Sequence, residues 1–415
     1  MKPVTSRERV LAAIEHREPD RVPVDLGAMR STGIMAMAYA RLREHLGIRS
    51  GEVFMYDVVQ GLAQPEDVVL DRFGIDVADL ARAFLTEADE RRPFRLMDGT
   101  PASVPAWFQP EDDGEGGYVV RDDTGRVIGA MPATQPYITQ TYHPLADGIT
   151  DQRLADLPEH MGRVTWGGLA TAPWHLPQTP TSLERIAETA KEFRASTDRA
   201  IMVAVGCNLL EWGQFLRGFG LFLEDLAADP QGAHKLLDRL VEVHLETIDR
   251  ALPAIGPHVD ILQMGDDLGT QAGPQISPSM YRTFFKDRHT ALYARAREVT
   301  GAKIFLHSCG GIAPLLPDLI EAGVEIINPV QTNAAGMEPE RLKREFGRDL
   351  CFWGGGVDTQ DVLRSGTPDQ VRAQVMERKR IFGEGGGFVF CQIHNILSDV
   401  PPENVVAMLE AAGGG

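Results

Sequence analysis

Two short stretches of the C-terminal half hold side chains that can bind a transition metal. His307 and Cys309 follow one apolar run, and Cys391 and His394 follow another. Residues i and i+2 of an extended segment point to the same side, so His307 and Cys309 can ligate one ion. Nitrogen and thiolate donors suit Zn²⁺, which keeps a fourth position open in catalytic sites. These residues indicate a zinc site made of His307, Cys309 and a partner from the second stretch.

The His-x-Cys pattern is short, and it leaves a second interpretation open. Cys309 and Cys391 can instead be small buried hydrophobic residues, with His307 and His394 as hydrogen-bonded loop residues. Spacing alone does not decide between metal ligation and packing.

Carboxyl groups near the ends of other apolar runs can act as acids or bases. Asp266 and Asp267 follow one run, and Asn208 and Glu211 follow another. A carboxyl group at a reacting centre can transfer a proton or complete a metal shell. Adjacent residues of an extended segment diverge, so only one of the two aspartates is expected to face a cavity. A helix cap is the alternative for the Asp pair and for Glu211. Asp266, Asp267 and Glu211 are the candidate catalytic residues.

The apolar runs alternate with amphipathic segments in a regular order. Short apolar strands separated by helices are typical of a parallel sheet. Eight such units predict a closed (β/α)₈ TIM barrel, an α/β fold, as a single domain over residues 1–415. An open doubly wound sheet is the alternative, but no Gly-rich dinucleotide motif supports it. The eight expected strands are 21–27, 75–80, 200–205, 258–263, 303–307, 325–328, 350–354 and 387–391.

Two further patterns place the remaining elements. Thr5 and Glu8 have the spacing of a capping box and predict a helix at the start of the chain. Residues 92–142 contain Pro and Gly clusters, with two β-rich runs around Asp-Asp-Thr-Gly, which predict a β-rich hairpin insertion. Active-site groups of a TIM barrel follow the C-terminal ends of its strands, so all the candidate residues are expected at one mouth.

Charge and composition exclude several classes of protein. The 415 residues carry a formal net charge of −18, which disfavours nucleic acid and anionic membranes as partners. No apolar stretch is long enough to span a bilayer, and the N-terminus lacks the apolar core of an export signal. We therefore expect a cytoplasmic protein whose four cysteines stay reduced.

Six motifs occur in an order that resembles the uroporphyrinogen decarboxylase superfamily. The resemblance spans nearly the whole chain and implies a TIM barrel with its cavity at the C-terminal mouth. The motifs are Arg21-Val-Pro-Val-Asp25, Gly265-Asp-Asp-Leu-Gly269, His307-Ser-Cys-Gly-Gly311, Asn328-Pro-Val-Gln331, Gly355-Gly-Val-Asp-Thr359, and His394-Asn-Ile396 with Asp399-Val-Pro-Pro-Glu-Asn404.

The superfamily has two chemical branches, and this chain is more similar to the second. True decarboxylases hold the substrate's carboxylates with an Arg-rich N-terminal segment, whereas residues 25–33 contain only Arg30. The cobamide-dependent methyltransferases include zinc members with a His-x-Cys pattern and a distant Cys. The resemblance implies that His307 and Cys309 are the first two zinc ligands. The third is either Cys391, by residue type, or His394, by position relative to the following Pro-x-x-Asn.

The methyltransferase branch also implies substrates and partners. The methyl donor or acceptor would be a thiol, tetrahydrofolate, or a methoxy or methylamine compound, as in one-carbon metabolism. No Asp-x-His-x-x-Gly cobalamin motif is present, so the corrinoid would be carried by a separate partner protein, and a homodimer is a further expectation. A decarboxylase of a smaller carboxylic acid is the alternative function. The candidate substrate-binding residues are Asn208, Gln263, Gln331, Asp358 and Tyr281.

Overall fold

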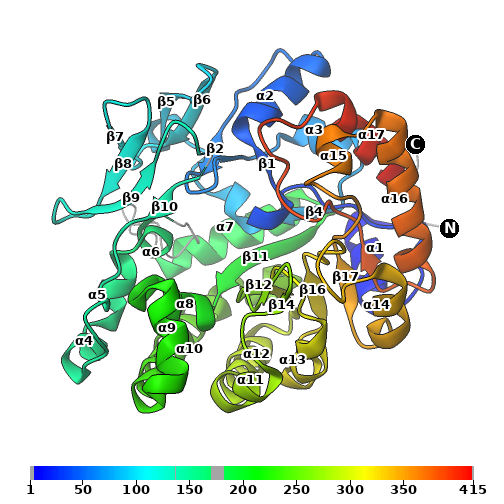
Figure 1. Cartoon of the computed structure of the whole chain (residues 1–415). Helices are drawn as coiled ribbons and strands as arrows, with labels where there is room; N and C mark the ends of the chain where they lie inside the picture. Colours follow the sequence, from blue (N-terminus) through cyan, green and yellow to red (C-terminus); the bar gives the residue numbers. More distant parts are fainter. Residues whose placement is uncertain (1–3, 136, 170–181, 414–415) are drawn as a thin grey trace.

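A parallel sheet of seven strands forms the centre of the molecule, curled into a barrel with helices outside it (Figure 1). The computed structural model describes residues 4–135, 137–169 and 182–413. The strands are β4 (Val77–Asp79), β11 (Ala200–Gly206), β12 (Ile261–Gly265), β15 (Lys303–His307), β16 (Ile326–Asn328), β17 (Cys351–Trp353) and β18 (Phe388–Val389). Their spatial order is β18-β17-β16-β15-β12-β11-β4, and each neighbouring pair is parallel.

The segment around Val24 closes the barrel between β18 and β4. The Phe390 N–H donates to the Pro23 carbonyl at 2.8 Å, and the Asp76 N–H donates to the Val24 carbonyl at 2.8 Å. Val24 thus occupies the eighth position, as a single parallel bridge to Phe390. The strand predicted over residues 21–27 is wrong in extent, because Pro23 has no N–H to extend the ladder. The fold is the predicted (β/α)₈ TIM barrel.

Helices follow the strands and cover the outside of the barrel. The longest helix among the described residues, α10, contains 26 residues. In the part of the chain that the structure describes, no helix is both long and apolar enough to cross a membrane. The helices are α1 (Ser6–Ile14), α2 (Ala36–His45), α3 (Asp67–Arg72), α4 (Asp151–Ala155), α5 (Leu157–Gly162), α6 (Thr165–Leu169), α7 (Leu183–Ser196), α8 (Leu210–Arg217), α9 (Phe219–Ala228), α10 (Pro230–Ile255), α11 (Pro278–Phe284), α12 (Lys286–Thr300), α13 (Leu316–Ala322), α14 (Pro339–Phe346), α15 (Val362–Ser365), α16 (Pro368–Gly383) and α17 (Pro402–Gly413).

The predicted insertion is rich in antiparallel strands and lies to one side of the barrel (Figure 1). The expected hairpin around Asp-Asp-Thr-Gly is confirmed by the pairing of β8 with β9. Three short strands, β1 to β3, form a separate small sheet before it. That residues 1–415 form one domain stays a prediction. These strands are β1 (Ile34–Met35), β2 (Met55–Asp57), β3 (Leu62–Ala63), β5 (Arg91–Arg95), β6 (Pro101–Pro105), β7 (Glu111–Asp112), β8 (Tyr118–Arg121), β9 (Val127–Met131) and β10 (Thr139–Gln140).

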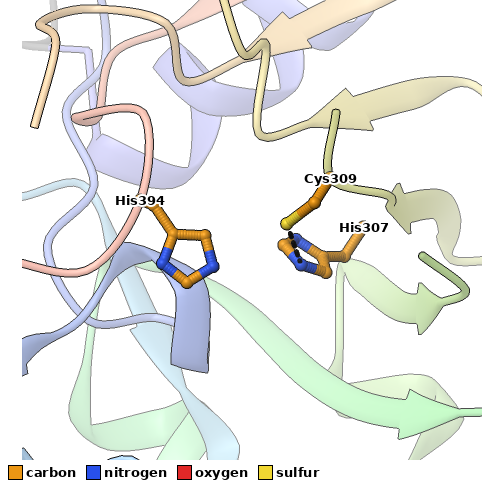
Figure 2. A group of neighbouring side chains, drawn as sticks. All are labelled: His307, Cys309 and His394. Atoms are coloured by element: carbon orange, nitrogen blue, oxygen red, sulfur yellow. Dashed lines mark hydrogen bonds between the residues drawn. The ribbon is translucent and has the colours of Figure 1, made fainter. Parts of the chain in front are cut away.

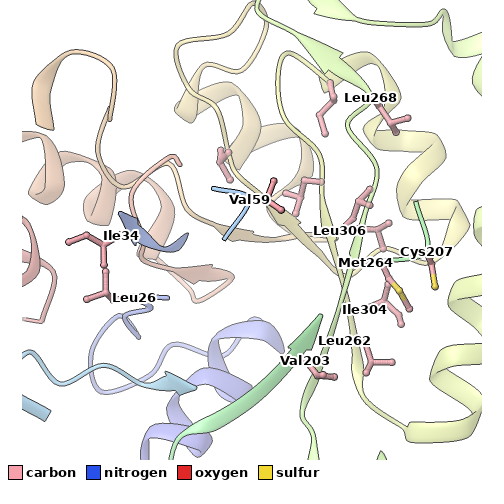
Figure 3. Packing of buried hydrophobic residues seen from close by; sticks show 14 of the residues in the cluster. Leu26, Ile34, Val59, Val203, Cys207, Leu262, Met264, Leu268, Ile304 and Leu306 are labelled. Atoms are coloured by element: carbon pink, nitrogen blue, oxygen red, sulfur yellow. The ribbon is translucent and has the colours of Figure 1, made fainter. Parts of the chain in front are cut away.

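Successive side chains of each strand point to opposite faces of the sheet, so the core has two layers, one inside the barrel and one between the strands and the helices. Side chains such as Phe305 and Trp353 fill the barrel interior, where their rings meet at 5.4 Å. Their sequence neighbours, Ile304 and Leu306 among them, face outward against the helices (Figure 3). Both layers are almost fully buried, so the strands are held from both sides. A rigid scaffold of this kind can position polar groups at strand ends.

Helix α1 packs against the barrel with one apolar side. The predicted capping box is confirmed, since the Thr5 hydroxyl accepts from the Glu8 N–H at 3.2 Å. Val10, Ala13 and Ile14 of this helix join the same buried cluster as the barrel interior. Burial of Val10 and Ile14, which are 0% and 4% exposed, contributes about 1.5–3 kcal/mol each.

Candidate metal centre

His307, Cys309 and His394 converge at the mouth of the barrel. His307 is the last residue of β15, Cys309 follows two residues later, and His394 reaches them from the loop after β18 (Figure 2). One ligand atom from each lies within 4.8 Å of the others. His307 Nε2 is 3.4 Å from Cys309 Sγ, and the two imidazole rings are 5.9 Å apart between centroids. Two nitrogens and one sulfur at this spacing fit the donor set of a zinc site.

Asn328 fixes the tautomer that His307 needs for ligation. His307 Nδ1 lies 2.8 Å from Asn328 Oδ1, while Asn328 Nδ2 donates to the Trp353 carbonyl at 2.8 Å. The amide oxygen therefore faces His307 and accepts its Nδ1 proton, which leaves a lone pair on Nε2 beside Cys309. Ser31 Oγ also donates to Asn328 Oδ1 at 2.8 Å. Neither Ser31 nor Asn328 was predicted from the sequence as a site residue. Asn328 could have been found from the strand register, because it lies opposite His307 where β15 pairs with β16.

The other two donors differ in how ready they are to bind a cation. Burial, followed by the neighbouring His307, lowers the pKa of His394 to about 4, so this imidazole is neutral and can ligate. Burial and the Asp267 and Glu211 carboxyl groups raise the pKa of the Cys309 thiol well above its usual value. Without a cation the thiol keeps its proton, whereas an adjacent metal ion would stabilise the thiolate. The residues therefore fit Zn²⁺.

Cys391 does not belong to this group of donors. Its side chain is fully buried in the barrel interior, and burial raises the pKa of its thiol. Asn328 Nδ2 lies 4.0 Å from Cys391 Sγ, so the Asn328 amide stands between Cys391 and the Nδ1 side of His307. Of the two alternatives for the third donor, the geometry brings His394 to the site and leaves Cys391 as a small buried side chain.

The two adjacent aspartates point in different directions, as expected. Asp267 lines the cavity; its Oδ1 accepts from the Cys309 N–H at 2.8 Å and lies 3.5 Å from His307 Nε2. Asp266 is fully buried outside the cavity lining and accepts from the backbone N–H groups of Leu210 and Glu211 at 2.9 and 3.0 Å. Asp266 therefore caps the start of α8, and Asp267 is the carboxylate placed for chemistry.

Glu211 faces the cavity and does not cap a helix. Its Oε2 accepts from Asn208 Nδ2 and from the Asp267 N–H, the latter at 3.0 Å. Burial, then the charges of Asp267 and Asp266, raises the pKa of Glu211 well above its usual value. These surroundings favour the protonated form of Glu211, which can donate a proton at the mouth of the barrel.

A cavity of about 680 Å³ opens from these residues. Asn208, Gln263, Asp267 and Glu211 line it together with His307 and His394. Gln263 uses its amide N–H to bind the Met264 carbonyl at 2.6 Å. These six predicted residues, which come from strands three, four, five and eight in chain order, thus meet at one surface.

Three predicted substrate-binding residues lie outside the lining of this cavity. Gln331 Oε1 accepts from the Gly310 N–H at 2.8 Å and supports the loop that carries Cys309. Asp358 accepts from the N–H groups of the following turn at Gln360 and Asp361. Tyr281 is fully buried, with its hydroxyl 3.1 Å from His289 Nδ1. Their polar groups are occupied within the protein, so the structure places them in supporting positions.

Comparison with known proteins identifies the family. A family model described as uroporphyrinogen decarboxylase (URO-D) matches residues 178–414, more than half of the chain. The chain belongs to this family. The predicted superfamily is thereby confirmed, and with it a relationship to enzymes.

Individual relatives are distant. A uroporphyrinogen decarboxylase of Coxiella burnetii is 26% identical over 211 residues, which cover 50% of this chain and 54% of that protein. One from Legionella pneumophila is 24% identical over 246 residues, covering 57% and 65%. The chain thus spans little more than half the length of the first of these curated relatives. A solved methyltransferase from Methanosarcina mazei, 18% identical, superimposes with a TM-score of 0.56 over 99% of this chain and 98% of its own. This likeness shows a shared fold.

Proposed function

We propose that this protein is a zinc-dependent methyltransferase that exchanges a methyl group between a small molecule and a corrinoid carried by a separate protein. The convergence of His307, Cys309 and His394 on one point of the barrel mouth carries the proposal. The shared fold with a methyltransferase of Methanosarcina mazei supports it. A homodimer and a cytoplasmic location stay predictions of the sequence.

Each residue of the site has a defined task in this proposal. Bound Zn²⁺ supplies a positive charge that lowers the pKa of a substrate thiol or polarises the oxygen or nitrogen of a methyl donor. Asn328 holds the His307 ring with Nε2 toward the metal position. Asp267 fixes the backbone at Cys309. Glu211, whose raised pKa favours its protonated form, can give its proton to a leaving oxygen or nitrogen.

Decarboxylation of a carboxylic acid is the second candidate, because the curated relatives are uroporphyrinogen decarboxylases. The charges of the cavity do not favour an anionic substrate. Arg30 and Arg250 line it, but so do Glu211, Glu246 and Asp267, and the Arg30 guanidinium is paired with Asp57. A substrate with several carboxylates would meet no net positive charge here.

Elemental analysis of the purified chain tests the metal role. We expect one zinc per chain, lost in Cys309→Ser and in His394→Ala and retained in the matched control Cys391→Ser. Methyl transfer from a methoxy or methylamine compound to free reduced cobalamin, followed by the change in corrinoid absorbance, should be lost in the first two variants only. A chain without metal under reducing, zinc-replete conditions would refute the proposal and favour metal-free decarboxylation.

A further inference from the structure

An aromatic wall, made of Trp166, Trp212 and Phe215, lines the same cavity as His307 and His394, two of the three proposed zinc ligands. Trp166 stacks on Phe215 with ring centroids 6.0 Å apart and an interplanar angle of 26°. Trp212 meets Phe215 edge-on, at 5.8 Å and 82°. All three side chains are half-buried. Nothing in the metal chemistry described above uses these rings.

Helix α8 carries both the polar end and part of the aromatic wall. Glu211 and Phe215 are four residues apart, so they lie on one face of the helix about one turn, or 5.4 Å, from each other. Trp212 directly follows Glu211 and lies three residues from Phe215. A six-membered ring packed on the wall can therefore direct one substituent toward Glu211.

The arrangement of the rings favours a flat ligand over a small cation. An aromatic cage for an ammonium group turns several ring faces toward one point. Here Trp166 and Phe215 are nearly parallel with ring centroids only 6.0 Å apart, which leaves too little space for an ammonium group between their faces. An L-shaped corner between Trp212 and Phe215 instead suits the stacked and edge-on contacts that aromatic rings make. Two methionines of the lining, Met29 and Met161, can add sulfur–ring contacts.

We propose that the small-molecule substrate of this site carries an uncharged aromatic ring, which packs against Trp212 and Phe215 while its methyl-bearing substituent points toward Glu211 and His307. This inference rests on the proposed methyl transfer and specifies its substrate class. The mixed charges of the cavity agree with a neutral ring, because two guanidinium groups and three carboxyl groups share the lining.

Ligand-observed NMR titration of the zinc-loaded chain tests the inference. The probes are methoxybenzene, its saturated analogue methoxycyclohexane, and tetramethylammonium. We expect methoxybenzene to bind about fivefold more tightly than methoxycyclohexane, equivalent to about 1 kcal/mol, and more tightly than the cation. Trp212→Leu should abolish the preference for the aromatic ring, and Trp212→Phe should retain it. Trp107→Phe is the matched control, because Trp107 packs on Phe108 in the insertion and does not line the cavity.

Equal binding of the two ethers, an undiminished preference in Trp212→Leu, or tighter binding of tetramethylammonium would overturn the aromatic site. Turnover separates this outcome from failure of the proposed function. Ring preference without methyl transfer to reduced cobalamin would overturn the methyltransferase proposal and leave the ring-binding site. Methyl transfer without ring preference would overturn the ring-binding site and leave the methyltransferase proposal.

Discussion

Replacement of Asp266 by alanine should destabilise the protein more than the same change at its neighbour Asp267. The Asp266 carboxylate is fully buried and accepts two backbone hydrogen bonds at the start of α8, of 2.9 and 3.0 Å. Asp267 accepts one backbone hydrogen bond, from the Cys309 N–H. Its side chain is 33% exposed, so a water molecule can take the place of the lost carboxylate. The two variants remove the same group from adjacent positions and therefore form a matched pair.

The size of the effect follows from the hydrogen bonds that are lost. Two bonds to a buried carboxylate at about 1.5 kcal/mol each give about 3 kcal/mol for Asp266→Ala, against about 1 kcal/mol for Asp267→Ala. His289 Nε2, 3.2 Å from Asp266 Oδ2, also loses the carboxylate that faces it. At an unfolding entropy of about 2.1 cal/mol/K per residue, 3 kcal/mol lowers Tm by about 3 °C in a chain of this length.

Scanning calorimetry, together with zinc analysis of the same samples, measures both consequences. Asp266→Ala should show the larger drop in Tm, and Asp266→Asn, which keeps one acceptor oxygen, should show about half of it. Asp267→Ala should keep nearly the parental Tm while it impairs methyl transfer. Equal losses of stability, or a larger loss in Asp267→Ala, would refute the assignment of Asp266 to the helix cap and Asp267 to the cavity.

Three further outcomes are expected. Burial raises the pKa of Asp25 and of Asp79 to about 6, above the unfolded value of 3.8, so the folded state binds their protons more tightly. The contribution of these two groups to stability should therefore be greatest below pH 4 and fall as the pH rises through about 6, by up to about 3 kcal/mol per group; denaturant titrations of Asp25→Asn beside the parent chain should lack about half of this contribution. Asn328→Ala should weaken zinc binding about 10- to 100-fold in a chelator competition, with a smaller loss in Ser31→Ala. Unchanged zinc affinity in both variants would show that Asn328 and Ser31 do not set the tautomer of His307. Gly310 has φ +89°, and a Cβ there would lie 2.4 Å from the Gly269 carbonyl carbon, so Gly310→Ala should cost about 2 kcal/mol in denaturant unfolding and reduce bound zinc, whereas parental behaviour would contradict the close approach of the two loops.

The barrel could be predicted because each strand and helix carries its own local pattern. Runs such as Lys303–His307 are short, apolar and followed by an amphipathic helix, so their number and order predict a parallel barrel. The first expected strand, over residues 21–27, was the exception in extent. Around Val24 the alternation of apolar residues is interrupted by Pro23, and only the contacts with Phe390 and Asp76 reveal that this segment closes the barrel.

The types of the site residues could be predicted from the sequence, but the directions in which their side chains point could be predicted less well. The divergence of Asp266 and Asp267 followed from strand geometry, but which of them faces the cavity depends on the α8 backbone, whose N–H groups bind Asp266. Glu211 could have capped that helix, and the burial that favours its protonated form arises only from the folded surroundings. The partners of His307 come from distant parts of the chain, Ser31 and Asn328, which no local pattern connects.

The choice between Cys391 and His394 has a chemical consequence. Val389 and Cys391 are two residues apart, and both belong to the barrel-interior cluster, so Cys391 points inward behind Asn328. His394 lies beyond the last ladder of β18, where the backbone turns toward His307 (Figure 2). With one thiolate and two neutral imidazoles, a bound Zn²⁺ would retain a net charge of about +1, whereas two thiolates would cancel its charge. A centre that keeps positive charge attracts electrons more strongly from a neutral methyl donor, which agrees with the uncharged aromatic substrate inferred from Trp212 and Phe215.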